Sequence, residues 1–322
     1  MIIVTGGAGF IGSAVIWMLN NKGFDDILVV DQLGTSDKWK NLVNRSYRDY
    51  IHKSEFLSAL EKRQFDPADC IVHMGACSST TETNADYLME NNFHYSVRLA
   101  TYALSNNIPF IHASSAATYG NGASGFCDDV AALGDLKPLN MYGYTKHLFD
   151  LWAVRTGAMQ KLTSLKFFNV FGPNEYHKGD MSSLAYKGFF QIQESGALRL
   201  FKSSHPEYED GGQRRDFVYV KDCAETIGWL IENPSVTGLF NIGSGIDRSW
   251  NDLATSLFRA MGLAEKIVYI DMPPQLAKAY QNFTRADMEK LKEAGCRLWQ
   301  TPLEKAVSDY VTHYLQNEDP YL

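Results

Sequence analysis

The feature that most constrains the fold is a glycine-rich segment directly after a short apolar run. Residues 2–4 are Ile-Ile-Val, and residues 5–12 read TGGAGFIG. Gly6 can adopt backbone angles that other residues disfavour, Gly9 lets the main chain approach a pyrophosphate, and Gly12 lets the next helix pack closely on the strand. The amides at the start of that helix then face the anion. The segment therefore predicts a strand, a turn and a helix that together bind a dinucleotide.

The residues that follow favour this interpretation over an ordinary glycine-rich turn. A helical apolar pattern begins at Phe10 and stops at Gly23, and a second buried strand at 27–30 ends in Asp31. An acidic residue about 20 positions after the glycines commonly accepts hydrogen bonds from the adenosine ribose. Because strand, helix and acid all occur in the required order, we predict a bound nicotinamide dinucleotide.

Strands and helices continue to alternate in the first half of the chain. We expect strands at 70–73, 109–115 and 165–168, and helices at about 83–105 and 142–156. This alternation of strands and helices is typical of a doubly wound parallel sheet, which binds ligands at the carboxyl edge of its strands. The irregular segment 121–136 is expected to form a mobile rim.

The regular alternation of strands and helices ends at residues 172–173. Shorter strands are expected after this point, at 199–201, 217–220, 239–242 and 267–270. Thr284 and Thr301 are predicted to begin helices with side-chain caps, the second with Pro302 in its first turn. We therefore predict an α/β fold: a Rossmann-type dinucleotide-binding domain over residues 1–170, to which about 217–243 return, and a smaller α/β substrate-binding lobe mainly over 171–322.

Composition excludes several classes of partner. The net charge is -7 without a lysine-arginine run, which argues against nucleic acid as a partner. The five cysteines are scattered and form no C-x-x-C spacing, so neither a disulfide framework nor a metal site is expected. Met1 leads directly into a strand without a positive leader, and no apolar run is long enough to cross a bilayer. These features favour a cytoplasmic protein.

A tyrosine and a lysine are spaced for acid/base chemistry. Tyr142 and Lys146 lie four residues apart, on one face of the expected helix, whereas Tyr144 points elsewhere. A nearby ammonium stabilises phenolate, so we expect Lys146 to lower the pKa of Tyr142 from about 10 toward neutrality. Upstream, Ser114 and Ser115 end a strand, where a hydroxyl can hold the substrate oxygen.

In this order, the glycine turn, the serine and the Tyr/Lys pair resemble the extended short-chain dehydrogenase/reductase (NAD-dependent epimerase/dehydratase) family over nearly the full chain. The resemblance implies that Tyr142 is the acid/base, that Lys146 also holds the nicotinamide ribose, and that Ser115 aligns the reacting hydroxyl. The distance to residues 119–120 selects Ser115 over Ser114. Ala116 and Ala117 occupy the place where dehydratases of the family carry an acidic pair.

Four strings, at 73–81, 114–120, 168–173 and 177–179, are similar to the branch of ADP-heptose 6-epimerases. That branch implies a lipopolysaccharide core precursor as product, a homo-oligomer with the pentamer as one candidate, and Lys178 as second acid/base. The implied cofactor-binding residues are Gly6, Gly9, Phe10, Ile11, Gly12, Asp31, Gln32, Lys38, Lys53, Met74, Gly75, Ala76, Cys77, Ser78, Asn91, Lys146 and Val170. The implied substrate-binding residues are Asn169, Asp180, Lys187, Phe201, Lys202, Ser203, Ser204, Arg215 and Tyr280.

Two of these positions depart from the branch, since Asp180 and Lys187 stand in place of a serine and a histidine. Arg215 suits a diphosphate because a guanidinium can bond two oxygens at once. For the cofactor, Asp31 favours NAD, whereas Lys38 and Lys53 match positions that help to hold NADP. We expect NADP, with NAD tolerated.

The reaction implied is transient oxidation at C6 and return of the hydride to the other face. A reductase or another epimerase acting on a different nucleotide sugar is one alternative. A catalytically inactive dinucleotide-binding protein on the same fold is a second, because fold does not fix function.

Overall fold

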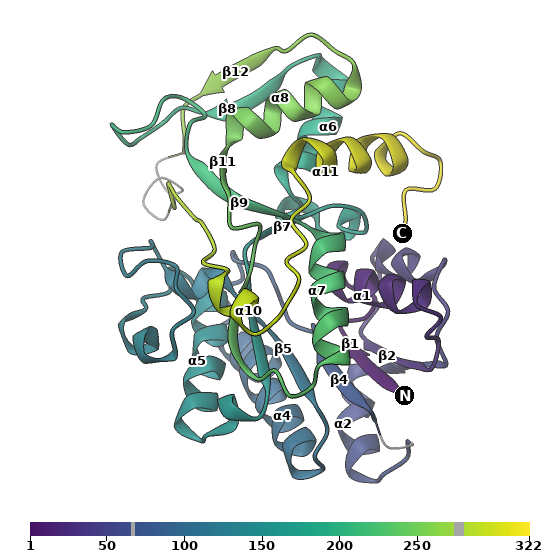
Figure 1. Ribbon diagram of the computed structural model, residues 1–322. Coiled ribbons are helices and arrows are strands. Elements are labelled where there is room, and N and C mark those ends of the chain that lie inside the picture. The colour runs from purple at the N-terminus through teal and green to yellow at the C-terminus, as the bar shows by residue number, and fades with distance from the viewer. Residues whose placement is uncertain (66–67, 274–279) are drawn as a thin grey trace.

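The computed structural model describes residues 1–65, 68–273 and 280–322. Its centre is a seven-stranded sheet in the order β10-β6-β5-β4-β1-β2-β3, in which every neighbouring pair is parallel (Figure 1). The strands are β1 (Ile2–Thr5), β2 (Ile27–Asp31), β3 (Asp49–His52), β4 (Cys70–His73), β5 (Phe110–Ser115), β6 (Thr163–Phe167) and β10 (Gly238–Ile242).

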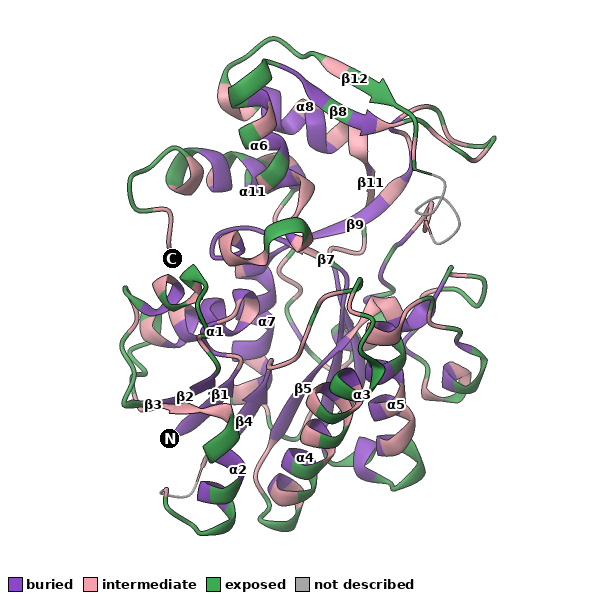
Figure 2. Cartoon of the chain, turned by 180° about the vertical axis from the view of Figure 1, so that it is seen from behind, coloured by how far each residue is buried: buried purple, intermediate pink, exposed green. Residues whose placement is uncertain are grey.

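Helices cover both faces of this sheet, which explains why the central strands β1 and β2 are nearly continuous apolar runs rather than alternating ones. In the two opposite views, α1 (Phe10–Asn21) and α7 (Val220–Glu232) lie on one face, and α4 (Tyr95–Ser105) and α5 (Met141–Arg155) on the other (Figures 1 and 2). The shorter α2 (Lys53–Glu61) contacts β2 and β3. The predicted Rossmann-type sheet is confirmed, and its strand order reverses between β1 and β4, where such sheets bind ligands.

The second half of the chain builds a smaller region around its own apolar cluster, beyond the carboxyl ends of the strands (Figure 1). It contains a three-stranded sheet in the order β11-β9-β7 and a pair of strands, β12 and β8. The strands are β7 (Asn169–Phe171), β8 (Leu198–Phe201), β9 (Arg214–Tyr219), β11 (Asp247–Ser249) and β12 (Ile267–Ile270). The helices are α6 (Leu184–Ser195), α8 (Trp250–Met261) and α11 (Leu303–Tyr310).

The long helix expected at 83–105 is present but contains a turn of π-helix. It consists of α3 (Ala85–Leu88), a π segment (Met89–His94) and α4. The side chain of Asn92 accepts from the amide of Cys77 at 2.8 Å and donates to its carbonyl at 3.0 Å. The π turn therefore orders the segment that follows β4.

Of the two expected helix starts, the first is wrong in position and the second is wrong only in its side-chain cap. Among the residues described, α10 (Glu289–Glu293) begins five positions after Thr284, whose hydroxyl instead accepts from the amide of Asp216. The helix after Thr301 begins as expected, but Pro302 precedes it without a side-chain cap, because the Thr301 hydroxyl donates to Asp222 at 2.7 Å. Both threonine hydroxyls therefore bond residues of other elements, Asp216 on β9 and Asp222 on α7, instead of capping a helix. No helix in the described part of the chain is both long and apolar enough to cross a bilayer.

Candidate active site

One cavity of about 1040 Å³ extends from the glycine turn, across the carboxyl edge of the central sheet, to the smaller region. Its volume matches the upper end of ordinary ligand pockets. The sides of the cavity come from β1, β2 and β5, from the segment 74–78 after β4, from α5, and from the turn Tyr176–Met181 after β7. It therefore combines elements from both halves of the chain.

The glycine turn forms the tight junction that the sequence predicts. Gly6 has a φ of +66°, and a Cβ there would lie 2.6 Å from the amide nitrogen of Gly75. A Cβ on Gly12 would lie 2.1 Å from the carbonyl oxygen of Gly6. Helix α1 begins after Gly9 without a side-chain cap, so its first amides are left for an anion at the cavity wall. This geometry fits a pyrophosphate.

A carboxylate and two ammonium groups lie where the adenosine end of a dinucleotide is expected. Asp31 accepts from the amides of Ala8 at 2.9 Å and Gln32 at 2.6 Å, and from Nζ of Lys38 at 2.5 Å. Lys53 donates to the side chain of Asn91 at 2.7 Å, and burial lowers its pKa while Asp31 opposes that shift. The cluster can therefore hold a hydroxyl and a phosphate together.

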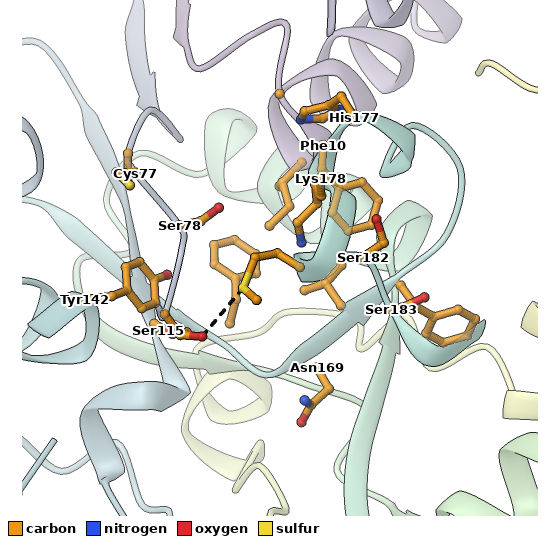
Figure 3. A pocket seen from close by; sticks show the side chains of 18 of the residues that line it. Phe10, Cys77, Ser78, Ser115, Tyr142, Asn169, His177, Lys178, Ser182 and Ser183 are labelled. Atoms are coloured by element: carbon orange, nitrogen blue, oxygen red, sulfur yellow. Dashed lines mark hydrogen bonds between the residues drawn. The ribbon is translucent and has the colours of Figure 1, made fainter. Parts of the chain in front are cut away.

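The expected acid/base pair lies on α5. Asn140 caps that helix through the amide of Gly143 at 2.8 Å. A Cβ on Gly143 would come within 2.8 Å of the carbonyl oxygen of Ala117, so glycine lets α5 approach the turn after Ser115. Tyr142 hydrogen-bonds Ser115, and the two side chains lie together at one side of the cavity (Figure 3).

The electrostatics of this pair differ from the expectation. Burial raises the pKa of Tyr142, and the hydrogen bond with Ser115 offsets this only in part. Lys146 is 2% exposed, and burial lowers its pKa to about 8. The nearby carboxylate of Asp150 opposes this shift. The positive charge of Lys146 also helps to lower the pKa of the buried imidazoles of His73 and His112. The expectation that Lys146 lowers the pKa of Tyr142 is therefore wrong for this structure.

The two serines at the end of β5 have different surroundings. Ser114 is buried and donates to Asp150 at 2.7 Å, whereas Ser115 bonds Tyr142 and accepts from the amide of Ala117 at 3.1 Å. A strand places successive side chains on opposite faces, so only one of two adjacent serines can bond Tyr142. This arrangement supports the choice of Ser115.

Lys178 enters the cavity from another element, the turn Tyr176–Met181, so the two candidate bases approach from separate parts of the chain (Figure 3). Its Nζ lies 5.1 Å from the centre of the Phe10 ring, close to the start of α1. Burial lowers the pKa of Lys178, Glu175 raises it, and Lys187 lowers it. An amine with a lowered pKa is suited to exchange protons near neutral pH.

His177, beside Lys178, also lines the cavity, although sequence reasoning treated it only as part of a motif. Burial, together with the charges of Lys38 and Lys178, lowers its pKa to about 4. Its imidazole is therefore neutral at physiological pH, and its Nδ1 lies 3.3 Å from the side-chain nitrogen Nδ2 of Asn41. In the sequence, the only signal for His177 was its place in the string 177–179, next to Lys178 and Gly179.

All of the expected cofactor residues line this cavity: Gly6, Gly9, Phe10, Ile11, Gly12, Asp31, Gln32, Lys38, Lys53, Met74, Gly75, Ala76, Cys77, Ser78, Asn91, Lys146 and Val170. Tyr142, Ser115 and Lys178 line it as well. Their roles stay predictions, but the structure brings them to one place.

The expected substrate residues are divided. Asn169, Lys187, Phe201 and Tyr280 line the cavity, whereas Asp180, Lys202, Ser203, Ser204 and Arg215 are not among its lining residues. The carbonyl of Asp180 accepts from Lys187 at 3.0 Å. The guanidinium of Arg215 lies 5.0 Å from the ring of Tyr280 and 5.6 Å from that of Trp250, so it supports the wall from behind.

Several lining residues lay outside the motifs that the sequence offered. They include Tyr87, Gln191, Arg199 and Trp250. Arg199 sits between two buried leucines on β8, and its own amide donates to Gln191 at 2.7 Å. Its place at the cavity depends on how β8 packs against α6, which a single sequence does not reveal.

Comparisons with known proteins agree with this geometry. Residues 2–243 match the sequence model described as "NAD dependent epimerase/dehydratase family". The ADP-L-glycero-D-manno-heptose-6-epimerase of Nitratidesulfovibrio vulgaris (strain DP4) is 57% identical over 323 residues, covering 100% of both chains. The enzyme of the same name from Fusobacterium nucleatum is 47% identical, again over 100% of both.

A solved structure is similar over nearly the whole chain. The crystal structure of the Helicobacter pylori ADP-L-glycero-D-manno-heptose-6-epimerase superposes with a TM-score of 0.82 at 26% identity. It covers 97% of this chain and 95% of its own. With its glycine turn, its Ser/Tyr/Lys cluster and these matches, the chain belongs to the NAD dependent epimerase/dehydratase family.

Proposed function

We propose that this protein is a nucleotide-sugar epimerase that inverts C6 of ADP-D-glycero-D-manno-heptose to give the L-glycero epimer, a precursor of lipopolysaccharide core. The observation that carries the proposal is the convergence of Ser115, Tyr142 and Lys178 on one dinucleotide-sized cavity. Full-length identity of 57% to a relative of that name supports the substrate.

The chemistry at C6 requires a redox cofactor, because the C6 hydrogen is not adjacent to a carbonyl and cannot leave as a proton. When bound, the nicotinamide ring accepts this hydrogen as hydride and gives it back. If the resulting ketone turns over in the site, hydride return to its other face inverts the centre. The protein must then remove a proton from O6 in one orientation and restore it in the other.

We assign these two proton transfers to Tyr142 and Lys178. Ser115 bonds the phenol of Tyr142 and can align the reacting hydroxyl on that side. Lys178 comes from the turn after β7, and its lowered pKa makes the neutral amine accessible. Because the two groups lie on separate elements, each can serve one orientation of the C6 oxygen.

For the cofactor we propose NADP, with NAD tolerated. Asp31 alone would repel a 2′-phosphate, but Lys38 neutralises it at 2.5 Å and Lys53 lies in the same cluster. The substrate-side residues Asn169, Lys187, Phe201 and Tyr280 line the cavity beyond Tyr142 and are proposed to contact the nucleotide sugar. A homo-oligomer remains part of the proposal.

The test is turnover of ADP-D-glycero-D-manno-heptose in deuterated water, followed at C6 by NMR spectroscopy and by nicotinamide absorbance. We expect both epimers to appear, C6 to retain protium, and the cofactor to show no net change. Net oxidation or reduction would indicate a dehydrogenase or reductase instead. Deuterium at C6 in proportion to turnover would exclude direct hydride return, and no turnover of any nucleotide sugar would favour an inactive dinucleotide-binding protein.

A further inference from the structure

The turn that carries Lys178 has little backbone support of its own. It follows the short strand β7, and Asn174 and Gly179 both have positive φ angles, 75° and 53°. The turn Tyr176–Met181 contains only a short 3-10 helix broken at Gly179. A segment of this kind keeps its position mainly through side-chain contacts, so the contacts around residues 174–178 decide where Lys178 lies.

On one side the segment is bound to the dinucleotide turn. The side chain of Asn174 donates to the hydroxyl of Ser13 on α1 at 2.9 Å. The side-chain amide of Asn41 lies 2.9 Å from the carbonyl oxygen of Ala8 and 3.1 Å from that of Asn174. The glycine turn and the Lys178 segment thus share a donor.

On the other side the segment contacts residues 319–322, far away in the sequence. The hydroxyl of Tyr176 donates to the carbonyl oxygen of Pro320 at 2.5 Å, and its ring meets that of Tyr321 edge-on at 5.3 Å. The amide of Leu322 donates to the side chain of Asn174 at 3.0 Å. These contacts lie two and four residues before Lys178.

Residues 319–322 are themselves anchored to the cofactor side. Asn44 donates to the carboxylate of Asp319 at 2.8 Å, and Arg45 donates to the carbonyl oxygen of Leu322 at 2.5 Å. Both donors follow the helical turn Asp37–Leu42, which carries Lys38 and Asn41. Leu322 is 5% exposed and packs into the apolar cluster of the central sheet. The segment is therefore a fixed part of the structure.

We propose that residues 319–322 act as a strap that positions Lys178, by clamping Asn174 and Tyr176 against the part of the chain that binds the dinucleotide. The proposal rests on the assignment of Lys178 as the second acid/base. The strap touches neither of the expected bases directly, so it is a positioning element. Glu175, whose carboxylate accepts from Ser183 and the amide of Gly172, anchors the same segment from inside. Loss of the strap should therefore misplace Lys178 without unfolding the turn completely.

The first measurement is amide hydrogen exchange in three proteins: a chain lacking residues 319–322, the variant Tyr176→Phe, and the control Tyr47→Phe. Tyr47 is partly exposed and its hydroxyl has no hydrogen-bond partner in the described part of the chain. We expect faster exchange over residues 172–183 in the first two and unchanged exchange in the control. Unchanged exchange in both test proteins would overturn the proposal, and this readout does not depend on activity.

The second measurement is a double-mutant cycle with Lys178→Met. Because a displacement of about 1 Å can cost about 10²-fold in rate, we expect loss of the strap to lower kcat by about 10- to 10²-fold with little change in KM. In the Lys178→Met background the same change should cost nothing further, since both act through one group. Multiplicative losses would overturn the proposal.

The two proposals fail in different ways. Full activity of Lys178→Met would remove Lys178 as a base, whereas the exchange result would still report whether the strap holds its segment. Should the shortened chain lose its fold, as judged by circular dichroism and bound dinucleotide, Tyr176→Phe decides the question, because it removes only one hydroxyl.

Discussion

Nζ of Lys38 lies 2.5 Å from Oδ1 of Asp31, so the carboxylate that ends β2 carries its own countercharge inside the dinucleotide cavity. An acidic residue at this position favours NAD when it stands alone, since it bonds the ribose hydroxyls and repels a 2′-phosphate. Lys38, with Lys53 in the same cluster, supplies positive charge that would offset this repulsion. The sequence position of Asp31 alone therefore does not decide the cofactor.

Replacing Lys38 or Lys53 by alanine should weaken NADP binding more than NAD binding. A hydrogen bond to a charged group contributes about 1.5–3 kcal/mol, so we expect a loss of about 10-fold or more for NADP. Calorimetric titration of both dinucleotides measures this. Lys40→Ala is the matched control, because Lys40 lies on the same turn but pairs with Asp37 and does not line the cavity. Equal losses for both cofactors would remove the phosphate role.

A nicotinamide dinucleotide should remain bound through purification. A cofactor that is regenerated in each turnover has no reason to leave, and the cavity that would hold it is lined by elements from both halves of the chain. Denaturing the purified protein and identifying the released nucleotide by mass spectrometry tests this and shows whether it is NADP or NAD. Finding no nicotinamide dinucleotide would count strongly against the internal hydride scheme.

Tyr142→Phe should reduce epimerisation by about 10²- to 10⁴-fold, the usual contribution of one well-placed acid/base. Tyr144→Phe should leave the rate unchanged, because Tyr144 lies two residues away on the same helix and is 45% exposed outside the cavity. Rates measured by NMR on both epimers, with cofactor content as a check on folding, compare the two variants. Similar rates in both variants would exclude Tyr142 as the base.

The dinucleotide half of the site was predictable because its geometry is encoded locally. Gly6 has a positive φ and a Cβ on Gly12 would meet the carbonyl oxygen of Gly6, so both glycines are required within one strand-turn-helix unit. Asp31, Gln32 and residues 74–78 follow the ends of buried strands. Strand β3 was missed because most of its residues are only partly buried, so it lacks a continuous apolar run.

The substrate side was less predictable because it depends on packing between distant elements. Phe201 ends β8 inside the cavity, but Lys202 turns outward to Asp271, an outcome of how β8 pairs with β12. Arg215 supports Tyr280 from behind rather than lining the wall. The pKa of Tyr142 could not be inferred from its spacing to Lys146 either, since burial depends on the whole cavity.

Asp150→Asn should destabilise the fold by about 3 to 5 kcal/mol, the usual cost of breaking a buried ion pair from one side. Asp150 and Lys166 are both 0% exposed, 3.5 Å apart, and Asp150 also accepts from Ser114 and Ser164. The change should also lower the pKa of Lys146 further, because Asp150 raises it. Urea denaturation measures the stability, with Asp135→Asn at an exposed position as control. Equal stability of the two variants would contradict the role of the pair.

The buried imidazoles of His73 and His112 and the partly buried imidazole of His177 should stay neutral well below pH 6.5. Burial lowers the pKa of His73 to about 3 and that of His177 to about 4, and places that of His112 well below its ordinary value. In the unfolded chain each takes up a proton as the pH falls through about 6.5, whereas the folded chain does not. The unfolded state then binds more protons, so each imidazole contributes stability above pH 6.5 that is lost, by up to about 1.4 kcal/mol per pH unit, between pH 6.5 and its folded pKa.

His73 gives the sharpest test, because its ring is held between Thr5 at 2.5 Å and Ser96 at 2.7 Å. Buried carboxylates such as Asp216, whose pKa burial raises, act in the opposite direction, so the total slope mixes several groups. The informative quantity is the difference in slope between the parent protein and His73→Gln from pH 6.5 to 5. We expect the stability of the variant to fall less steeply with decreasing pH, whatever its absolute value. Equal slopes, or an imidazole resonance of His73 that titrates near pH 6.5 in the folded protein, would show that its ring accepts a proton in place.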